Sequence, residues 1–121
     1  MTTARRALGR MGEQLAGEYL LARGYELVAR NWRAGRLGEV DVIVRDRDCL
    51  VFVEVRTRQS VHYGSPEESV TPTKQARLAA LAAAYCADAD WHGPVRVDVI
   101  AVTPAPDGDW QVRHIVDAVS G

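Results

Sequence analysis

Apolar side chains recur every three or four residues near the start of the chain, which is the spacing of one helix face. They are Leu8, Met11, Leu15, Tyr19 and Ala22. Because Gly24 is a typical C-terminal stop, we expect a helix over about residues 8–23. Small residues form a second stripe beside Glu13, namely Gly9, Gly12, Ala16 and Gly17. They would let another element approach closely, so we expect Glu13 to point into a packed region or a cleft.

Three runs rich in β-branched and aromatic residues follow this helix and predict strands. They cover residues 25–32, 37–45 and 50–58, and the polar residues 46–48 form a turn between the last two. Short connections favour antiparallel neighbours, so we expect an antiparallel meander.

Side chains alternate between the two faces of a strand, which sorts the last two runs into an apolar and a charged face. The apolar face holds Val40, Val42, Val44, Val51, Val53 and Val55. Both valine rows must join the core, and a slip of one residue would turn one row outward. We therefore expect Glu39, Asp41, Glu54 and Arg56 to share the opposite face.

The second half of the chain predicts another helix. Thr71 and Pro72 supply an N-cap and a first-turn proline, so the helix runs to about residue 86. Lys74 lies in its first turn, and we expect the stem of this side chain to lie against the sheet while the ammonium group reaches a strand end.

A buried strand over residues 95–102 follows, interrupted by Asp98. We interpret Asp98 as a structural partner for a buried arginine or a backbone group, because a buried charge needs a partner. The strand–helix–strand succession favours a parallel crossover, and residues 110–119 add a final strand or a short helix. The pattern as a whole predicts an α/β domain with a mixed sheet.

Composition places the chain among ordinary globular domains. It has 121 residues, 47% of them hydrophobic and 26% charged, which excludes disordered, collagen-like and coiled-coil classes and predicts a single domain over 1–121. No apolar run approaches the roughly 18 residues that span a bilayer, and no signal peptide is evident, so we expect a cytoplasmic protein without membrane contact. Cys49 and Cys86 lack the spacing of a zinc site or a disulfide framework.

Charge is nearly balanced overall but not along the chain. The net charge of −1 argues against a uniformly basic nucleic-acid-binding surface. Residues 1–60 carry 11 basic and 8 acidic side chains, whereas residues 61–121 carry 4 and 8. Any nucleic-acid contact should therefore use the first half of the chain.

The charged strand face indicates metal chemistry. Unpaired buried carboxylates are costly, and a divalent cation would offset them. Mg²⁺ and Mn²⁺ prefer carboxylate, carbonyl and water oxygens, so Asp41, Glu54 and the Val55 carbonyl are candidate ligands. We expect Glu39 to face solvent or pair with an arginine.

Several ordered motifs closely resemble the YraN-like uncharacterised protein family. They are Gly12-Glu13, Asn31-Trp32-Arg33, Gly38-Glu39-Val40-Asp41, Phe52-Val53-Glu54-Val55-Arg56-Thr57-Arg58, Gly64-Ser65-Pro66, Lys74 and Arg96-Val97-Asp98-Val99. That family is similar to the PD-(D/E)xK endonuclease superfamily, in particular to Holliday junction resolvases. The resemblance implies a restriction-endonuclease-like three-layer fold, with a central mixed sheet flanked by helices.

Carried over by position, the resemblance makes Asp41 and Glu54 metal ligands and Glu13 a further acidic member of the catalytic site. Arg56 occupies the position of the catalytic lysine. A guanidinium group holds phosphate and stabilises negative charge, but it does not readily shuttle protons. Lys74 is the only lysine in the chain and is a candidate for supplying the missing ammonium group.

The resemblance thus implies a Mg²⁺- or Mn²⁺-dependent endonuclease that acts on structured or branched DNA as a homodimer. We expect Arg33, Arg36, Arg58 and Lys74 to contact nucleic acid. Two alternatives stay open, namely a nucleic-acid-binding module without hydrolytic activity and a protein-interaction scaffold.

Overall fold

The computed structural model describes residues 2–59 and 70–119. Its elements are α1 (Thr2–Ala22), β1 (Glu26–Arg33), a 3-10 turn η1 (Gly35–Leu37), β2 (Glu39–Asp46), β3 (Cys49–Thr57), α2 (Pro72–Ala89), β4 (Val95–Pro104) and β5 (Trp110–Ile115). The strands form one sheet in the order β1-β2-β3-β4-β5, in which only the β3–β4 pair is parallel. The predicted meander and mixed sheet are confirmed, and the segment after residue 110 is a strand.

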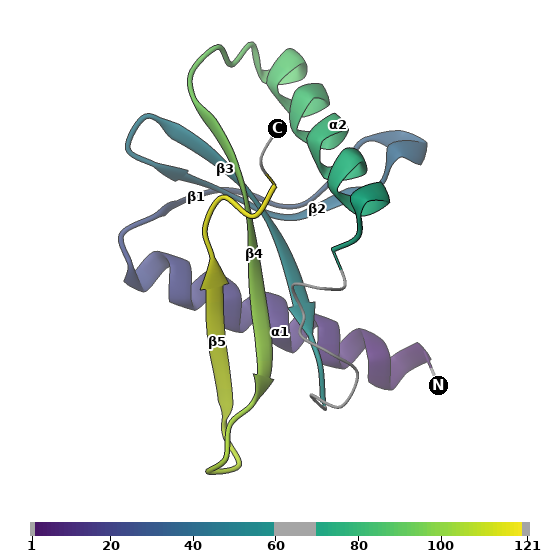
Figure 1. Cartoon of the computed structure of the whole chain (residues 1–121), viewed down its shortest axis with the longest axis vertical. Helices are drawn as coiled ribbons and strands as arrows, with labels where there is room; N and C mark the ends of the chain where they lie inside the picture. Colours follow the sequence, from purple (N-terminus) through teal and green to yellow (C-terminus); the bar gives the residue numbers. More distant parts are fainter. Residues whose placement is uncertain (1, 60–69, 120–121) are drawn as a thin grey trace.

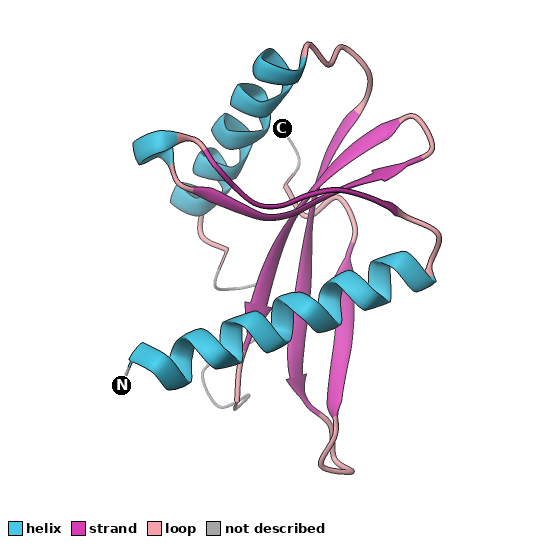
Figure 2. Cartoon of the chain, turned by 180° about the vertical axis from the view of Figure 1, so that it is seen from behind, coloured by secondary structure: helices cyan, strands magenta, loops and turns pink. Residues whose placement is uncertain are grey.

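The two helices lie on opposite faces of the sheet (Figures 1 and 2). On one face, α1 packs Ala16 and Leu20 against the apolar side chains of a cluster that includes Val42, Val53 and Ile100. The opposite cluster joins α2 to the sheet, with these members among others: Leu78, Leu81, Ile43, Phe52 and Val99. The result is the three-layer α/β architecture expected for a restriction-endonuclease-like fold.

Both helices extend beyond the residues that periodicity predicts. The first begins at Thr2 instead of near residue 8, and the second ends at Ala89 instead of near residue 86. Thr71 caps α2 as expected, since its hydroxyl accepts a hydrogen bond from the backbone N–H of Lys74 at 3.3 Å. The Gly64-Ser65-Pro66 motif lies outside the described residues.

Small side chains bring α1 close to the sheet, as their stripe predicts. A Cβ at Gly12 would overlap the Thr57 hydroxyl and lie 2.9 Å from Thr57 Cβ, and a Cβ at Gly17 would meet the guanidinium of Arg30. Glycine is therefore needed at position 12 for the helix to approach β3 this closely.

The hairpin register is confirmed, with one correction. Val42 pairs with Val53 and Val44 with Val51, so these four valines share the face that packs on α1. Val40, however, packs in the cluster beneath α2 and not with its expected row.

A local change of backbone conformation explains the correction. Asn31 of β1 has a left-handed backbone with φ 51°, and it lies between the pairs Arg30–Val42 and Trp32–Val40. Arg30 contacts α1, whereas Trp32 packs against the α2 cluster. The two strands thus change faces together, which a strict period of two does not anticipate.

Candidate acidic site where two strands separate

The site is formed where β2 and β3 stop pairing. Their register ends at Val42 and Val53, although both strands continue, and β3 stays paired with β4 as far as Thr57. Beyond this point the Asp41 carboxylate takes the place of a strand partner, because its Oδ2 accepts a hydrogen bond from the Val55 N–H at 2.8 Å. Asp41 is thereby fixed in the opening between the strands.

A cavity of about 270 Å³ opens there, between Glu13 on α1 and the first turns of α2. We call it the acidic cavity; its charged lining consists of Glu13, Glu39, Asp41, Glu54, Arg56, Lys74 and Arg77. The four charged strand residues expected on one face all line this cavity, although β2 changes faces between Val40 and Val42. Glu13 also points into a cleft as expected.

The acidic cavity strongly disfavours charge on Asp41. Burial and the nearby Glu54 carboxylate raise the pKa of Asp41 to about 8, with a smaller contribution from Glu13, while the Val55 hydrogen bond opposes the shift. The protein itself does not supply enough positive charge at this point to keep the carboxylate ionised near neutral pH. A cation bound there would do so.

Three carboxylates converge on one point of the cavity. Glu13, Glu39 and Asp41 each place one oxygen within 4.8 Å of the others. Asn31 links two of them, since its Nδ2 donates to Glu13 at 3.0 Å and to Glu39 at 3.1 Å. Glu39 also pairs with Arg33 at 3.3 Å, which confirms the arginine partner expected for it.

Sequence reasoning missed the role of Asn31. Asparagine adopts the left-handed backbone conformation more readily than most residues, and the φ of 51° turns its side chain toward the acids. An asparagine inside a strand-like run was the available signal. The sequence alone did not indicate which side chains would accept hydrogen bonds from its amide group.

Glu54 lines the same cavity, but it forms an ion pair with a neighbouring arginine. Arg56 lies 2.9 Å from the Glu54 carboxylate, and their side chains are only 15% and 14% exposed. The Arg56 Nε is buried and has no hydrogen-bond partner among the described residues. Arg56 therefore retains one unsatisfied buried donor, and its side chain lines the acidic cavity.

The backbone of Val55 offers another oxygen. The N–H groups of Leu50 and Arg58 donate to carbonyls on the β4 side, at 3.0 Å each. Alternate residues of β3 thus point their peptide groups to β4, and Val55 points toward β2. A residue in a strand directs its N–H and its carbonyl to the same edge, so the Val55 carbonyl faces the opening beside Asp41.

These donors fit a hard divalent cation. Carboxylate and carbonyl oxygens surround a small polar cavity, and the charge they carry is only partly neutralised by the protein. Mg²⁺ and Mn²⁺ use one or two carboxylates and keep several waters, which matches Asp41 with Val55 and one further acid. The structure favours Glu13 and Glu39 for that further acid more than the expected Glu54, because only these two gather with Asp41 within 4.8 Å among the described residues.

Lys74 lies in the first turn of α2 as expected, and it lines the acidic cavity together with residues of β2 and β3. Burial and the Arg56 guanidinium lower the pKa of Lys74, while Glu54 opposes the shift. The other expected nucleic-acid contacts are more dispersed. Arg33 is an exposed partner of Glu39, Arg36 lies in η1, and Arg58 lines a neighbouring cavity.

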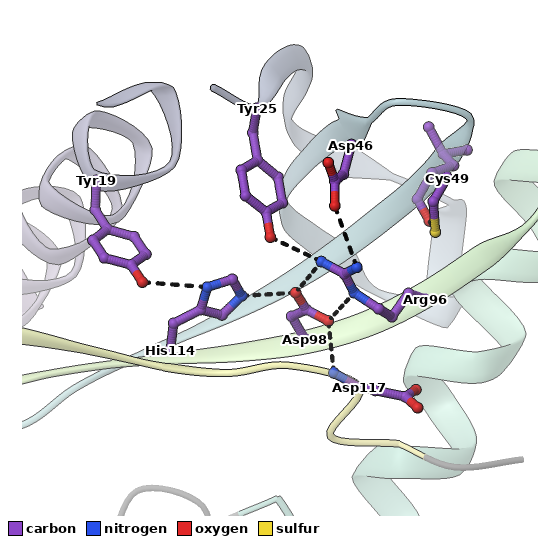
Figure 3. Close-up of polar contacts among 9 residues, drawn as sticks. Tyr19, Tyr25, Asp46, Cys49, Arg96, Asp98, His114 and Asp117 are labelled. Atoms are coloured by element: carbon purple, nitrogen blue, oxygen red, sulfur yellow. Dashed lines mark hydrogen bonds and ion pairs between the residues drawn. The ribbon is translucent and has the colours of Figure 1, made fainter. Parts of the chain in front are cut away.

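A second buried acid lies away from this site, in the network of Figure 3. Asp98 accepts hydrogen bonds from Arg96 at 2.9 and 3.0 Å, from His114 at 2.7 Å and from the backbone N–H of Asp117 at 2.9 Å. Burial favours the neutral acid, but these donors outweigh it and hold the pKa of Asp98 below its ordinary value. The expected structural role of Asp98 is confirmed.

Known proteins resemble this chain over nearly its whole length. The model of the uncharacterised protein family UPF0102 matches residues 12–102. A UPF0102 protein of Symbiobacterium thermophilum is 49% identical, covering 93% of this chain and 96% of its own. UPF0102 proteins of Beutenbergia cavernae and Rhodococcus jostii are each 48% identical, covering 93% of this chain and 95% of their own. These matches confirm the resemblance to the YraN-like family.

Within residues 2–59 and 70–119, neither helix is long and apolar enough to cross a membrane.

Proposed function

Starting from the fact that the chain belongs to the uncharacterised protein family UPF0102, we propose that it is a metal-dependent endonuclease acting on structured or branched DNA in the cytoplasm. The observation that carries the proposal is the position of Asp41. It is buried between separating strands, fixed by the Val55 N–H, and surrounded by Glu13, Glu39 and Glu54. Neighbouring carboxylates disfavour one another's charge, and such a cluster in a cavity is typical of a functional site.

Asp41, the Val55 carbonyl and an acid from Glu13, Glu39 or Glu54 would hold Mg²⁺ or Mn²⁺. The ion supplies charge stabilisation at a phosphodiester oxygen and a more acidic bound water. Asn31 orients Glu13 and Glu39 through its two hydrogen bonds. The remaining chemistry falls to the cationic side chains.

In this proposal, Arg56 and Lys74 together take the role of the single catalytic lysine of the PD-(D/E)xK superfamily. Arg56 lines the acidic cavity and is suited to hold a phosphate oxygen, since a guanidinium group binds phosphate and does not give up its proton. Lys74 carries the only primary amine side chain, and its lowered pKa brings it closer to proton transfer near neutral pH. Lys74 is therefore our candidate for the proton-transfer group.

The cations around the cavity indicate how DNA would be bound. Arg33, Arg36, Arg58 and Lys74 would contact phosphates, and none of these contacts depends on base sequence. A four-way junction needs two symmetric incisions, so we expect a homodimer on that substrate. Sedimentation with and without junction DNA measures this directly.

Cleavage of linear, flapped and four-way DNA in Mn²⁺ tests the proposal. We expect nicking of a branched substrate by the full chain, and a loss of about a hundredfold or more in Asp41→Ala. Glu26→Ala, which removes an exposed acid from β1, is the matched control and should cleave like the wild type. Equal activity in Asp41→Ala and the control would exclude Asp41 from the chemistry.

A second candidate function is DNA binding without hydrolysis, and the Glu54–Arg56 ion pair favours it. In that case the wild type binds DNA in a salt-sensitive manner and cuts none of the substrates with any divalent metal. Arg56→Lys separates the two functions. Cleavage gained by this variant would identify the wild-type site as a nuclease held back by one residue.

A further inference from the structure

A second cavity of about 610 Å³ adjoins the acidic cavity. We call it the arginine cavity; its lining consists of Arg5, Leu8, Gly9, Glu13, Val55, Thr57, Arg58 and Gln59. Its walls are the N-terminal half of α1 and the end of β3, where the helix crosses the strand (Figures 1 and 2). Its volume lies within the range of small-molecule sites.

The two cavities share two lining residues but differ in the charge of their side chains. Both are lined by Glu13 and Val55, so the two cavities adjoin each other at these residues. The acidic cavity is lined by four carboxylates, whereas Glu13 is the only carboxylate among the described residues that line the arginine cavity. Among the described residues, no carboxylate forms an ion pair with Arg5 or Arg58.

The arginine cavity combines the features of a nucleotide site. Leu8, Gly9 and the flank of Val55 provide an apolar wall for a sugar or a base, and Thr57 and Gln59 add hydrogen-bonding groups. A guanidinium group binds phosphate oxygens in a bidentate manner. Arg58 uses one Nη1–H for the Thr57 carbonyl at 3.2 Å and has further N–H groups for a phosphate. A base that stays stacked in a duplex would not enter, because unstacking and unpairing it costs a few kcal/mol.

We propose that the arginine cavity binds one unpaired nucleotide next to the cleaved phosphodiester, with Arg5 and Arg58 on its phosphate. This inference rests on the proposed function, since the acidic cavity is taken as the place of cleavage. It assigns the preferred substrate to DNA that is single-stranded on this side of the scission. The preference comes from shape and charge, without readout of the base.

Gly9 allows a sharp test. It lines the cavity, and no heavy atom lies within 4 Å of the position that a Cβ would take. A Cβ there meets no atom beyond its own stretch of helix, so a larger side chain would extend into the cavity, and replacing a helical glycine favours the helix. Gly9→Leu should therefore stay folded while it blocks the site. Ala7→Leu, two residues before Gly9 on an exposed position that does not line the cavity, is the matched control.

The experiment measures the Kd of a fluorescent 12-nucleotide single strand and of the corresponding blunt duplex, with the full chain in low salt and without divalent metal. We expect the wild type to bind the single strand at least five times more tightly. Gly9→Leu should weaken single-strand binding about tenfold and change duplex binding by less than twofold. Arg58→Ala should weaken the same interaction and reduce its salt dependence, and Ala7→Leu should change neither affinity.

Equal effects of Gly9→Leu on both ligands, or no effect on either, would overturn the inference. The proposed function fails separately, by an absence of cleavage in Mn²⁺. If Gly9→Leu reduces single-strand binding and no substrate is cut, the nucleotide site stands and the nuclease does not. If the wild type cuts branched DNA and Gly9→Leu binds every ligand normally, the reverse holds.

Discussion

Asp41 and Asp98 are both carboxylates in valine-rich strands, and the protein treats them in opposite ways. Asp98 is fully buried and receives donors from Arg96, from His114 and from the backbone of Asp117 (Figure 3). Asp41 receives one backbone donor and is crowded by other acids. The pKa of Asp98 is lowered as a result, and the pKa of Asp41 is raised to about 8.

The difference shows how to separate a structural acid from a functional one. A buried carboxylate that serves the fold is satisfied entirely by the chain, so that its charge is stabilised before any ligand arrives. A carboxylate that serves a ligand is left incompletely satisfied, and its surroundings raise the free energy of its charged form. Burial alone does not distinguish the two; the number and sign of the neighbouring groups do.

The strongest test of this comparison replaces each acid with asparagine. Asp98→Asn removes the charge from a buried network, and we expect a loss of roughly 3 kcal/mol in the free energy of unfolding. This is the low end of the range for such pairs, because Arg96 keeps Asp46 at 3.6 Å and the Tyr25 hydroxyl at 3.0 Å. Asp41→Asn resembles the neutral acid, and we expect a change of less than about 1 kcal/mol.

Urea unfolding of the two variants at pH 7 without divalent metal provides the measurement. Equal destabilisation of both variants would show that Asp41 stabilises the fold as much as Asp98 does, and it would contradict the difference that we infer between the two acids.

Metal binding should increase the difference between the two acids, since we expect a cation to bind at Asp41 and not at Asp98. With Mn²⁺ at about a hundred times its Kd, we expect about 2.7 kcal/mol of added stability, which raises Tm by roughly 10 °C. Asp41→Asn should lose most of this gain, whereas Glu26→Gln, an exposed change on β1, should retain it. Scanning calorimetry over a series of Mn²⁺ concentrations measures the shift, and a gain that survives Asp41→Asn would place the ion elsewhere.

The alternation of the strands was sufficient to predict most of this arrangement. It placed Asp41, Glu54 and Arg56 together, and the small residues of α1 indicated that Glu13 lies in a cleft. Asp98 was predicted as a partner of a buried arginine because a lone acid in an apolar strand needs one.

The parts that were not predicted depend on contacts distant in sequence. Val40 changes faces because Asn31, on another strand, adopts a left-handed conformation that a period of two does not contain. The Glu54–Arg56 pair depends on side-chain orientations along β3, where both residues alternate to the same face but need not meet. The arginine cavity required the position of α1 over the end of β3, which hydrophobic periodicity leaves open.

The smallest expected effect is the pH dependence that Asp98 contributes. Its folded pKa lies below the ordinary value, so the unfolded chain binds the proton more readily. The stability due to Asp98 is therefore fully present above about pH 4 and is lost as the pH falls through the folded pKa. One such group changes the free energy of unfolding by at most about 1.4 kcal/mol per pH unit. The advantage of the wild type over Asp98→Asn should thus shrink below pH 4 in urea titrations between pH 2.5 and 6. An advantage that stays constant down to pH 2.5 would show that hydrogen-bond geometry, and not the charge of Asp98, stabilises this network.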